Sequence, residues 1–229
     1  MNIQPRSVRL FVERWLYTLV YHGLVKTGII SSHFDVDYRH VVRSGKIRCI
    51  TVMKGYFESG NEHSRRLLES FHLRESLRSR VRPLLSRIPE GRTPLFIHLR
   101  RSDFGDLKQM LPDGYYHAAA HVMQKLCSHA FYIIVGDDPE YAEKLFRDIG
   151  PKYVSRLSTA EDLALMTLCK GGILSNSTFA WWGACFGQGS VGYVAPEFWT
   201  GFAKGAWIPP EIRAGFMTEI VAVPGAHTA

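Results

Sequence analysis

Apolar and polar residues along the second part of the chain form blocks whose lengths fit strands and helices in turn. Short apolar runs are typical of strands buried on both faces of a sheet, and longer stretches with apolar residues three and four apart are typical of helices. The predicted strands are Leu95–Leu99, Phe131–Val135, Tyr153–Leu157, Gly172–Leu174 and Val191–Ala195. The predicted helices are Gly114–Cys127, Pro139–Ile149, Ala160–Lys170 (with capping-box spacing of Ser158 and Glu161) and Asn176–Phe186. Strands separated by helices predict a doubly wound α/β fold, a parallel sheet with helices on both faces.

The first part of the chain is less regular. Two helical segments and one strand are predicted there: Arg9–Val25, Arg65–Ile88 with an interruption at Pro83, and Lys46–Met53. The composition changes near Pro89–Thr93, where we place a domain boundary. This boundary gives a shortened, mainly helical N-terminal region over residues 1–92 and a sheet domain over residues 93–229.

Composition narrows the class of protein. Hydrophobic residues make up 46% and charged residues 21% of the 229 residues, which fits a folded globular chain. The four cysteines are far apart and form no CxxC pair, which indicates a reduced, cytoplasmic protein rather than a disulfide scaffold or a zinc domain. The segment Trp15–Val25 is shorter than the roughly 20 apolar residues of a membrane span. Lys26 follows it and no small-residue cleavage site appears, so it is a poor signal peptide.

Positive charge is concentrated in the first part. The net charge is 28 − 21 = +7, with 17 basic against 8 acidic residues in 1–92 and 11 against 13 in 93–229. Seven arginines fall on one predicted helical region: Arg65, Arg66, Arg74, Arg78, Arg80, Arg82 and Arg87. A solvated helix face is the commoner role of such a run, and peripheral contact with the anionic inner face of a membrane is the alternative. No nucleic-acid recognition motif accompanies the charge, so nucleic acid is not a predicted partner.

Polar residues follow three of the predicted strands. The three clusters are His98 with Arg100, Arg101, Ser102 and Asp103; Gly136 with Asp137 and Asp138; and Ser175 with Asn176, Ser177 and Thr178. Ligands of doubly wound sheets bind outside the carboxyl ends of the strands. Two arginines and a hydroxyl-rich helix start favour an anion, and nearby carboxylates suit ribose hydroxyls or the N–H edge of a base. The clusters therefore predict a site for a nucleoside diphosphate.

Each cluster also has a structural interpretation. An Arg101–Asp103 ion pair, a helix cap at Asp137-Asp138-Pro139 and a second cap at Asn176–Thr178 are the alternatives. Trp181 and Trp182 are predicted to pack rather than to stack on a ligand. Walker A and GxSxG motifs are absent, which argues against P-loop enzymes and serine hydrolases. Asp137-Asp138 is not an Asp-x-Asp metal clamp, and no His/Asp/Glu constellation calls for a bound metal, so neither metal nor cofactor is predicted.

Several of these segments resemble a known family. HLRRSD (His98–Asp103) looks like the H-x-R-R-x-D motif of fucosyltransferases that use GDP-fucose. VGDD (Val135–Asp138) and EDLALMTLCKGGILSNSTFAWWGA (Glu161–Ala184) resemble later motifs of glycosyltransferase family 11, the α-1,2-fucosyltransferases. GYFES (Gly55–Ser59) is similar to the segment that introduces the second domain there, with glutamate where glutamine is usual. Nothing before Gly55 matches the GGLGNQ-type segment with which members usually begin, which implies a shortened first half.

The resemblance implies a GT-B architecture of two facing Rossmann-like halves. It implies metal-independent, inverting transfer of L-fucose from GDP-fucose to a galactose hydroxyl of a glycan, in α-1,2 linkage. The implied contacts are Arg100 to the β-phosphate, Ser177 and Thr178 to the phosphates, Asp162 to guanine, His98 to the nucleoside, and Asp137 or Asp138 to the ribose region. Arg100 and Asp103 are the implied catalytic residues, Asp103 as the only base that the motif offers, although pairing with Arg101 is its other role. The alternative function is a catalytically inactive GDP-sugar-binding remnant of such an enzyme.

Overall fold

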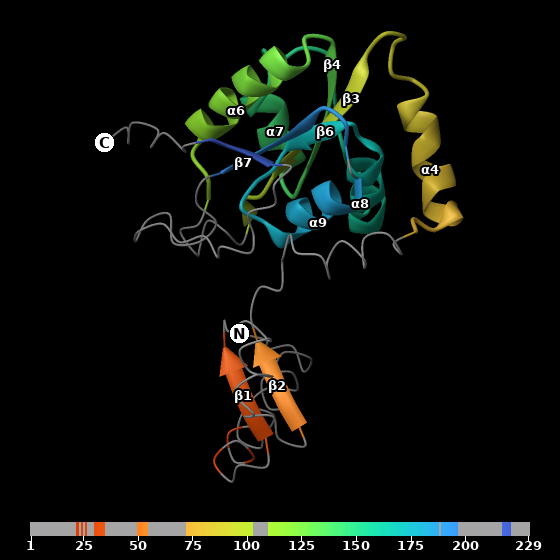
Figure 1. Cartoon of the computed structure of the whole chain (residues 1–229). Helices are drawn as coiled ribbons and strands as arrows, with labels where there is room; N and C mark the ends of the chain where they lie inside the picture. The colour runs from red at the N-terminus through yellow and green to blue at the C-terminus, as the bar shows by residue number, and fades with distance from the viewer. Residues whose placement is uncertain are drawn as a thin grey trace, which may run out of the picture. The chain divides into compact units, whose positions relative to one another are not determined.

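The computed structural model describes residues 22, 24, 26, 30–34, 50–54, 72–102, 110–187, 189–196 and 217–220. It divides into two compact units, Met1–Phe57 and Glu58–Ala229. In the first unit, β1 (Ile30–Phe34) and β2 (Ile50–Lys54) pair in parallel, as Figure 1 shows. The strand β2 overlaps the predicted strand Lys46–Met53, whereas β1 was not predicted. Most of the predicted helix Arg9–Val25 lies outside the described residues.

The second unit contains the predicted alternation of strands and helices. Its strands are β3 (Thr93–Leu99), β4 (Ala130–Gly136), β5 (Lys152–Val154), β6 (Gly171–Ile173), β7 (Gly192–Pro196) and β8 (Met217–Ile220). Its helices are α4 (Glu75–Leu85), α6 (Asp113–Leu126), α7 (Pro139–Leu145), α8 (Thr159–Leu168) and α9 (Thr178–Gly187). The α/β fold predicted from the sequence is therefore confirmed, with bounds that shift by a few residues.

The described strands of this unit form one parallel sheet in the order β5-β4-β3-β6-β7-β8. The first three strands extend the sheet in one direction from β3, and the chain then crosses to β6 and extends it in the other. This is the Rossmann strand order, in which the direction of winding reverses between the first and the fourth strand. In this chain the reversal lies between β3 and β6.

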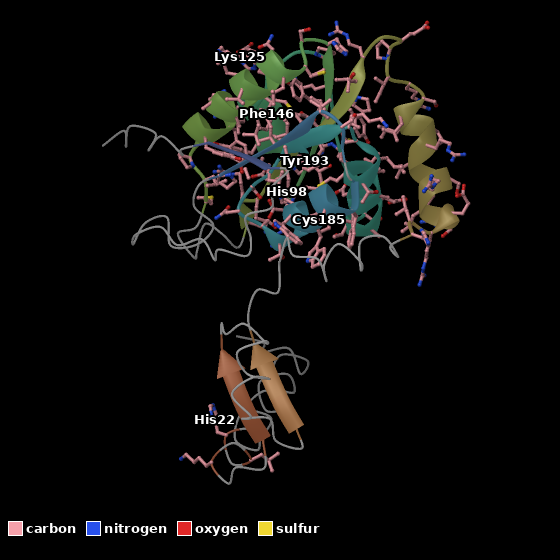
Figure 2. The ribbon with its side chains drawn as sticks, viewed as in Figure 1. His22, His98, Lys125, Phe146, Cys185 and Tyr193 are labelled. Atoms are coloured by element: carbon pink, nitrogen blue, oxygen red, sulfur yellow. The ribbon has the colours of Figure 1, made fainter. Side chains whose placement is uncertain are left out.

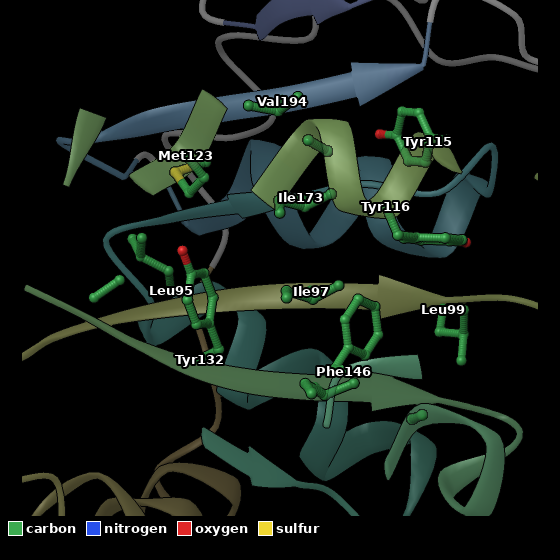
Figure 3. Packing of buried hydrophobic residues seen from close by; sticks show 14 of the residues in the cluster. Leu95, Ile97, Leu99, Tyr115, Tyr116, Met123, Tyr132, Phe146, Ile173 and Val194 are labelled. Atoms are coloured by element: carbon green, nitrogen blue, oxygen red, sulfur yellow. The ribbon is translucent and has the colours of Figure 1, made fainter. Parts of the chain in front are cut away.

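Side chains alternate along the central strands and build a core on each face of the sheet. Leu95, Ile97 and Leu99 of β3 pack with Tyr115 and Met123 of α6 (Figure 3). Phe96 of β3 points to the opposite face, where α8 and α9 cover the sheet (Figure 1). Both faces of β3 are thus buried, which explains why this strand is continuously apolar in sequence.

Helix α4 belongs to the second unit. Its residue Val81 is fully buried in the core under α8, and Arg80 pairs with Glu161 of α8 at 3.7 Å. The sequence-based boundary at Pro89–Thr93 therefore falls inside a compact unit, because the apolar side of α4 completes one of its two cores. The helix also continues through Pro83 and ends two residues later, so the predicted interruption is the last turn of the helix.

Two other boundaries and the last strand of the sheet differ from the sequence-based predictions. Helix α7 ends at Leu145, and the predicted remainder up to Ile149 forms turns. Strand β5 stops at Val154 because Ser155 begins the connection to α8. The strand β7 was predicted to be the last, but β8 pairs beside it. The short MTEI segment of β8 has no apolar run that would have indicated a strand.

Within the described part of the chain, no helix has both the length and the apolar sequence that crossing a bilayer requires. The three cysteines described, Cys127, Cys169 and Cys185, are buried and none forms a disulfide.

Candidate functional site

The carboxyl ends of β3 and β6 meet where the winding of the sheet reverses. His98 of β3 and Ser175, two residues beyond β6, are linked there by a hydrogen bond of 2.7 Å between Nδ1 and Oγ. The two residues are 77 positions apart in the chain, and they become neighbours only because β6 pairs directly with β3. Doubly wound folds bind ligands at this switch point.

His98 is a buried side chain on the α9 face of the sheet (Figure 2). It is 3% exposed, and its ring centroid lies 5.5 Å from that of Phe179 in α9. Burial lowers the pKa of His98 to about 4, with the charge of Arg100 acting in the same direction and Asp137 opposing it. The imidazole is therefore neutral at neutral pH.

The loop after β3 is organised by one carboxylate at the end of β4. Asp137 accepts hydrogen bonds from the backbone N–H groups of Arg101 at 2.9 Å and Ser102 at 3.2 Å, and from the Ser102 hydroxyl at 2.6 Å. The guanidinium of Arg100 lies 3.0 Å from the same carboxylate. Burial raises the pKa of Asp137, but the hydrogen bonds from Ser102 and Arg101 and the charge of Arg100 outweigh it and lower that pKa below its ordinary value. Asp137 therefore fixes the loop that presents Arg100.

A glycine allows this close approach. Leu99 and Gly136 are paired in the sheet, and a Cβ on Gly136 would lie 2.4 Å from the carbonyl oxygen of Leu99. Any other residue would push the ends of β3 and β4 apart, and with them Arg100 and Asp137.

The neighbouring Asp138 caps a helix, which is the structural alternative that the sequence analysis left open. Its Oδ1 accepts a hydrogen bond of 3.0 Å from the backbone N–H of Tyr141 and caps α7, with Pro139 in the first turn. A contact from Asp137 or Asp138 to a ribose remains a prediction.

Arg101 turns away from Arg100 and contacts two helices. Its guanidinium lies over the ring of Tyr141 in α7, 3.5 Å from the centroid. Its Nη1 is 3.8 Å from Asp113 of α6. The predicted internal pairing of Arg101 is therefore present, with Asp113 as the partner that the structure describes. Asp103, the partner and base considered from the sequence, lies outside the described residues.

The segment between β6 and α9 forms the other side of the site. Ser175 and Asn176 are buried, and Ser177 is 9% exposed. The N–H of Trp181 donates to the carbonyl oxygen of Ser177 at 3.1 Å, which makes Ser177 the residue that precedes the first helical turn. Thr178 begins α9. The positive end of the α9 dipole and the first N–H groups of this helix therefore lie beside the end of β6.

A tyrosine on α6 supports this segment from the opposite face of the sheet. The Tyr115 hydroxyl donates to the carbonyl oxygen of Leu174 at 2.5 Å, directly before Ser175. Trp181 is fully buried in the core, as predicted, and packs edge-on against Trp182.

Asp162 lies in the first turn of α8, beyond the end of β5. It is 8% exposed and accepts a hydrogen bond of 2.5 Å from the Ser155 hydroxyl. Burial, with a smaller contribution from Glu161, raises the pKa of Asp162 to about 6, although the Ser155 hydrogen bond opposes the rise. The predicted capping box of Ser158 and Glu161 is present at the start of the same helix.

These positions define what the site can do. One arginine, a helix N-terminus and a neutral histidine meet at adjacent strand ends, and such a combination binds an anion with several oxygens. A buried carboxylate follows the end of β5, on the other side of β4. Among the described residues, no group of three His, Cys, Asp or Glu side chains could hold a metal ion.

Four residues of this region were not identified from the sequence. Ser155 orients Asp162, Tyr115 supports the β6 end, and Tyr141 with Asp113 holds Arg101. Ser155 lies inside the predicted strand Tyr153–Leu157, and only the structure, which ends β5 at Val154, places it at a strand end. The helix residues carried no signal, because their partners are distant in sequence.

Comparison with known proteins identifies the family of this chain. The model of "Glycosyl transferase family 11" matches residues 29–203. The O-antigen biosynthesis glycosyltransferase WbnK of Escherichia coli is 32% identical over 107 residues, 42% of this chain and 35% of that protein. An alpha-1,2-colitosyltransferase of Escherichia coli is 22% identical over 190 residues, 76% of this chain and 64% of that protein. The chain therefore spans less than two thirds of the length of either relative.

Two solved structures are similar at low identity. A glycosyl transferase family 9 protein from Veillonella parvula has a TM-score of 0.47 and 13% identity, and the match covers 88% of this chain and 65% of that one. The NodZ alpha-1,6-fucosyltransferase soaked with GDP-fucose has a TM-score of 0.44 and 15% identity, covering 65% and 56%. The family assignment rests on the sequence match, which extends over more than half of the chain: this protein belongs to glycosyl transferase family 11.

Proposed function

We propose that the protein transfers L-fucose from GDP-fucose to a galactose hydroxyl of a glycan, with inversion and in α-1,2 linkage. The observation that carries the proposal is the pairing of β3 with β6 at the switch point. The Arg100 loop follows β3 and the segment before α9 follows β6, and the His98–Ser175 hydrogen bond joins these two strand ends. Family membership supports the reaction class. The linkage is supported by the name of the alpha-1,2-colitosyltransferase relative, which also makes colitose the second sugar to test.

The site suits a departing nucleoside diphosphate. As the acceptor hydroxyl attacks the anomeric carbon, the bond to the β-phosphate oxygen breaks and negative charge accumulates on GDP. Arg100 and the N-terminus of α9, with the hydroxyls of Ser177 and Thr178, stabilise that charge where it develops. Because both elements are fixed before the donor binds, little reorganisation is needed during the reaction. No metal is part of this proposal.

Asp162 is the group proposed to select guanine. Its carboxylate can accept hydrogen bonds from both N–H groups on the guanine edge, whereas adenine offers no such pair of donors. Ser155 already donates to one carboxylate oxygen and so limits rotation of the group. His98, neutral and buried, is proposed to contact the nucleoside.

Two measurements on the full chain test the proposal. Calorimetric titration should show GDP binding more tightly than ADP, and equal affinities would refute the guanine assignment. Incubation with radiolabelled GDP-fucose and galactose-terminated glycans should yield labelled product. GDP-fucose binding without transfer to any acceptor would favour the alternative function, a catalytically inactive GDP-sugar-binding remnant.

The proposed setting is the cytoplasm, with peripheral contact at the inner membrane face where lipid-linked glycans are met. The support is the positive charge of the α4 region. The α4 region exposes Arg74, Arg80, Arg82 and Arg87 to solvent, whereas Arg78 is half-buried and pairs with Glu75 at 3.6 Å. Exposed arginines near an anionic surface attract it in a salt-dependent way.

A further inference from the structure

Two consecutive arginines after β3 have different partners. Arg100, 34% exposed, lies against Asp137 at the end of β4. Arg101, 22% exposed, extends to α6 and α7. Arg100 and Arg101 are consecutive residues just beyond the end of β3, so contacts that fix the Arg101 side chain also restrict the backbone that carries Arg100.

Tyr141 is the centre of the contacts that hold Arg101. The guanidinium carbon lies 3.5 Å from the ring centroid, which is stacking distance for a cation on an aromatic face. The Tyr141 hydroxyl donates to Asp113, whose two carboxylate oxygens both lie at 2.7 Å. The same carboxylate is 3.8 Å from Arg101 Nη1. The ring therefore binds Arg101 directly, while the hydroxyl holds the carboxylate that attracts it.

The loop is thus fixed at two levels. Asp137 holds its backbone through the N–H groups of Arg101 and Ser102. Tyr141 holds the Arg101 side chain of this loop. Without the second contact, Arg101 would keep only its 3.8 Å pairing with Asp113, and the backbone bonds to Asp137 would mainly set the direction of Arg100.

We propose that Tyr141 is a positioning residue for Arg100: by stacking on Arg101 and holding Asp113, it fixes the loop that presents Arg100 to an anionic donor. The proposal rests on the proposed function in one respect, the identity of that anion as the diphosphate of GDP. Tyr141 itself is not proposed to contact substrate.

The test uses the full chain with Tyr141→Leu, which removes ring and hydroxyl, and Tyr141→Phe, which keeps the ring. Phe131→Leu is the matched control, since Phe131 is a half-buried ring at the amino end of β4, away from the site. We expect GDP to bind about tenfold more weakly to Tyr141→Leu and about two- to threefold more weakly to Tyr141→Phe. The control should bind GDP as the wild type does.

A double-mutant cycle separates positioning from a general loss of structure. If Tyr141 acts through Arg100, then Tyr141→Leu should weaken GDP binding less than about twofold when Arg100 is already replaced by lysine. A tenfold loss in both backgrounds would overturn the inference.

A measurement without ligand distinguishes this inference from the proposed function. In ¹⁵N relaxation of the ligand-free protein, the amides of residues 100–102 should have order parameters of about 0.85 in the wild type and below about 0.6 in Tyr141→Leu. Unchanged order parameters in the variant would overturn the inference whatever binds. A wild type that does not bind GDP would instead refute the proposed function.

Discussion

Replacing Asp162 by asparagine should leave the fold at least as stable at neutral pH while weakening GDP binding. The Asp162 carboxyl is 8% exposed and its pKa is raised from 3.8 to about 6, chiefly by burial. At pH 7 the carboxyl is largely ionised in both states, but only the folded protein holds the charge in a buried position, which lowers its stability. The Ser155 hydroxyl can donate to an asparagine carbonyl as it does to the carboxylate.

The size of this effect follows from the two pKa values. One pKa unit corresponds to about 1.4 kcal/mol, so the ionised carboxyl lowers the stability of the fold by about 3 kcal/mol well above pH 6. Below pH 3.8 the group is protonated in both states and the penalty is zero. Between these two pH values the carboxyl is protonated only in the folded state. The contribution of Asp162 to the stability of the wild type therefore falls as pH rises from about 4 through 6. The new amide N–H₂ costs about 1–3 kcal/mol if it finds no acceptor, which offsets part of the gain.

Urea unfolding of both proteins at pH 4 and at pH 7.5 measures this difference. The free energy of unfolding of Asp162→Asn relative to wild type should rise by about 3 kcal/mol between the two pH values. The matched control is Glu161→Gln, one residue earlier: hydrogen bonds from Ser158 lower the pKa of Glu161, so its pH dependence should have the opposite sign. A relative stability that is equal at both pH values would refute the burial argument. A GDP affinity unchanged by the substitution would refute the guanine role.

Three further substitutions, one NMR titration and one vesicle experiment test other features of the molecule. Arg100→Lys keeps the charge but loses the planar fork. It should weaken donor binding by one to two decades, which corresponds to a loss of about 1.5–3 kcal/mol. Arg101→Lys should weaken donor binding less, and the reverse order in calorimetry would exchange the roles of the two arginines. Gly136→Ala should lower the melting temperature and the GDP affinity together, because its Cβ would clash with the Leu99 carbonyl; an unchanged melting temperature would contradict this. The His98 imidazole should show no titration by NMR above about pH 5, and a midpoint near 6.5 would contradict its burial. Because the unfolded chain binds this proton more readily than the folded protein, the stability of the fold should decrease as pH falls from 6.5 toward 4. Sedimentation with anionic vesicles should decrease as salt rises, and no binding at low salt would leave the arginines of α4 as a solvated face.

The predictability of the fold varied along the chain for physical reasons. Helices and strands with apolar periodicity, such as Gly114–Cys127 and Phe131–Val135, were found within a few residues because burial on a known face creates the pattern. The β8 segment was missed because its four residues carry no such pattern. The boundary at Pro89–Thr93 differed from the structural one because a change in composition does not report which core a helix completes.

The site residues divide in the same way. His98, Arg100 and the residues before α9 could be proposed because polar clusters after the strands of a doubly wound sheet lie where ligands bind. The pairing of Arg101 with Asp113 and the support of Leu174 by Tyr115 could not, since nothing local in a helix indicates which loop it will contact. The sequence also could not decide between a cap and a ligand role for Asp138; the structure shows the cap.

Strand order is the step that turns the separate polar clusters into one site. From the sequence, β3, β4, β5 and β6 follow each other, and a sheet that kept this order would separate the His98 cluster from the Ser175 cluster by two strands. The crossing from β5 to β6 passes over the sheet through α8 and returns the chain to β3. This reversal brings a loop with Arg100 and a helix N-terminus to adjacent strand ends, which no single segment of the chain provides. It follows that substitutions on the two sides of the β3–β6 boundary should be coupled in GDP binding: removing Ser175 should matter less once His98 is replaced, and additive effects would show that the two strand ends act as separate sites.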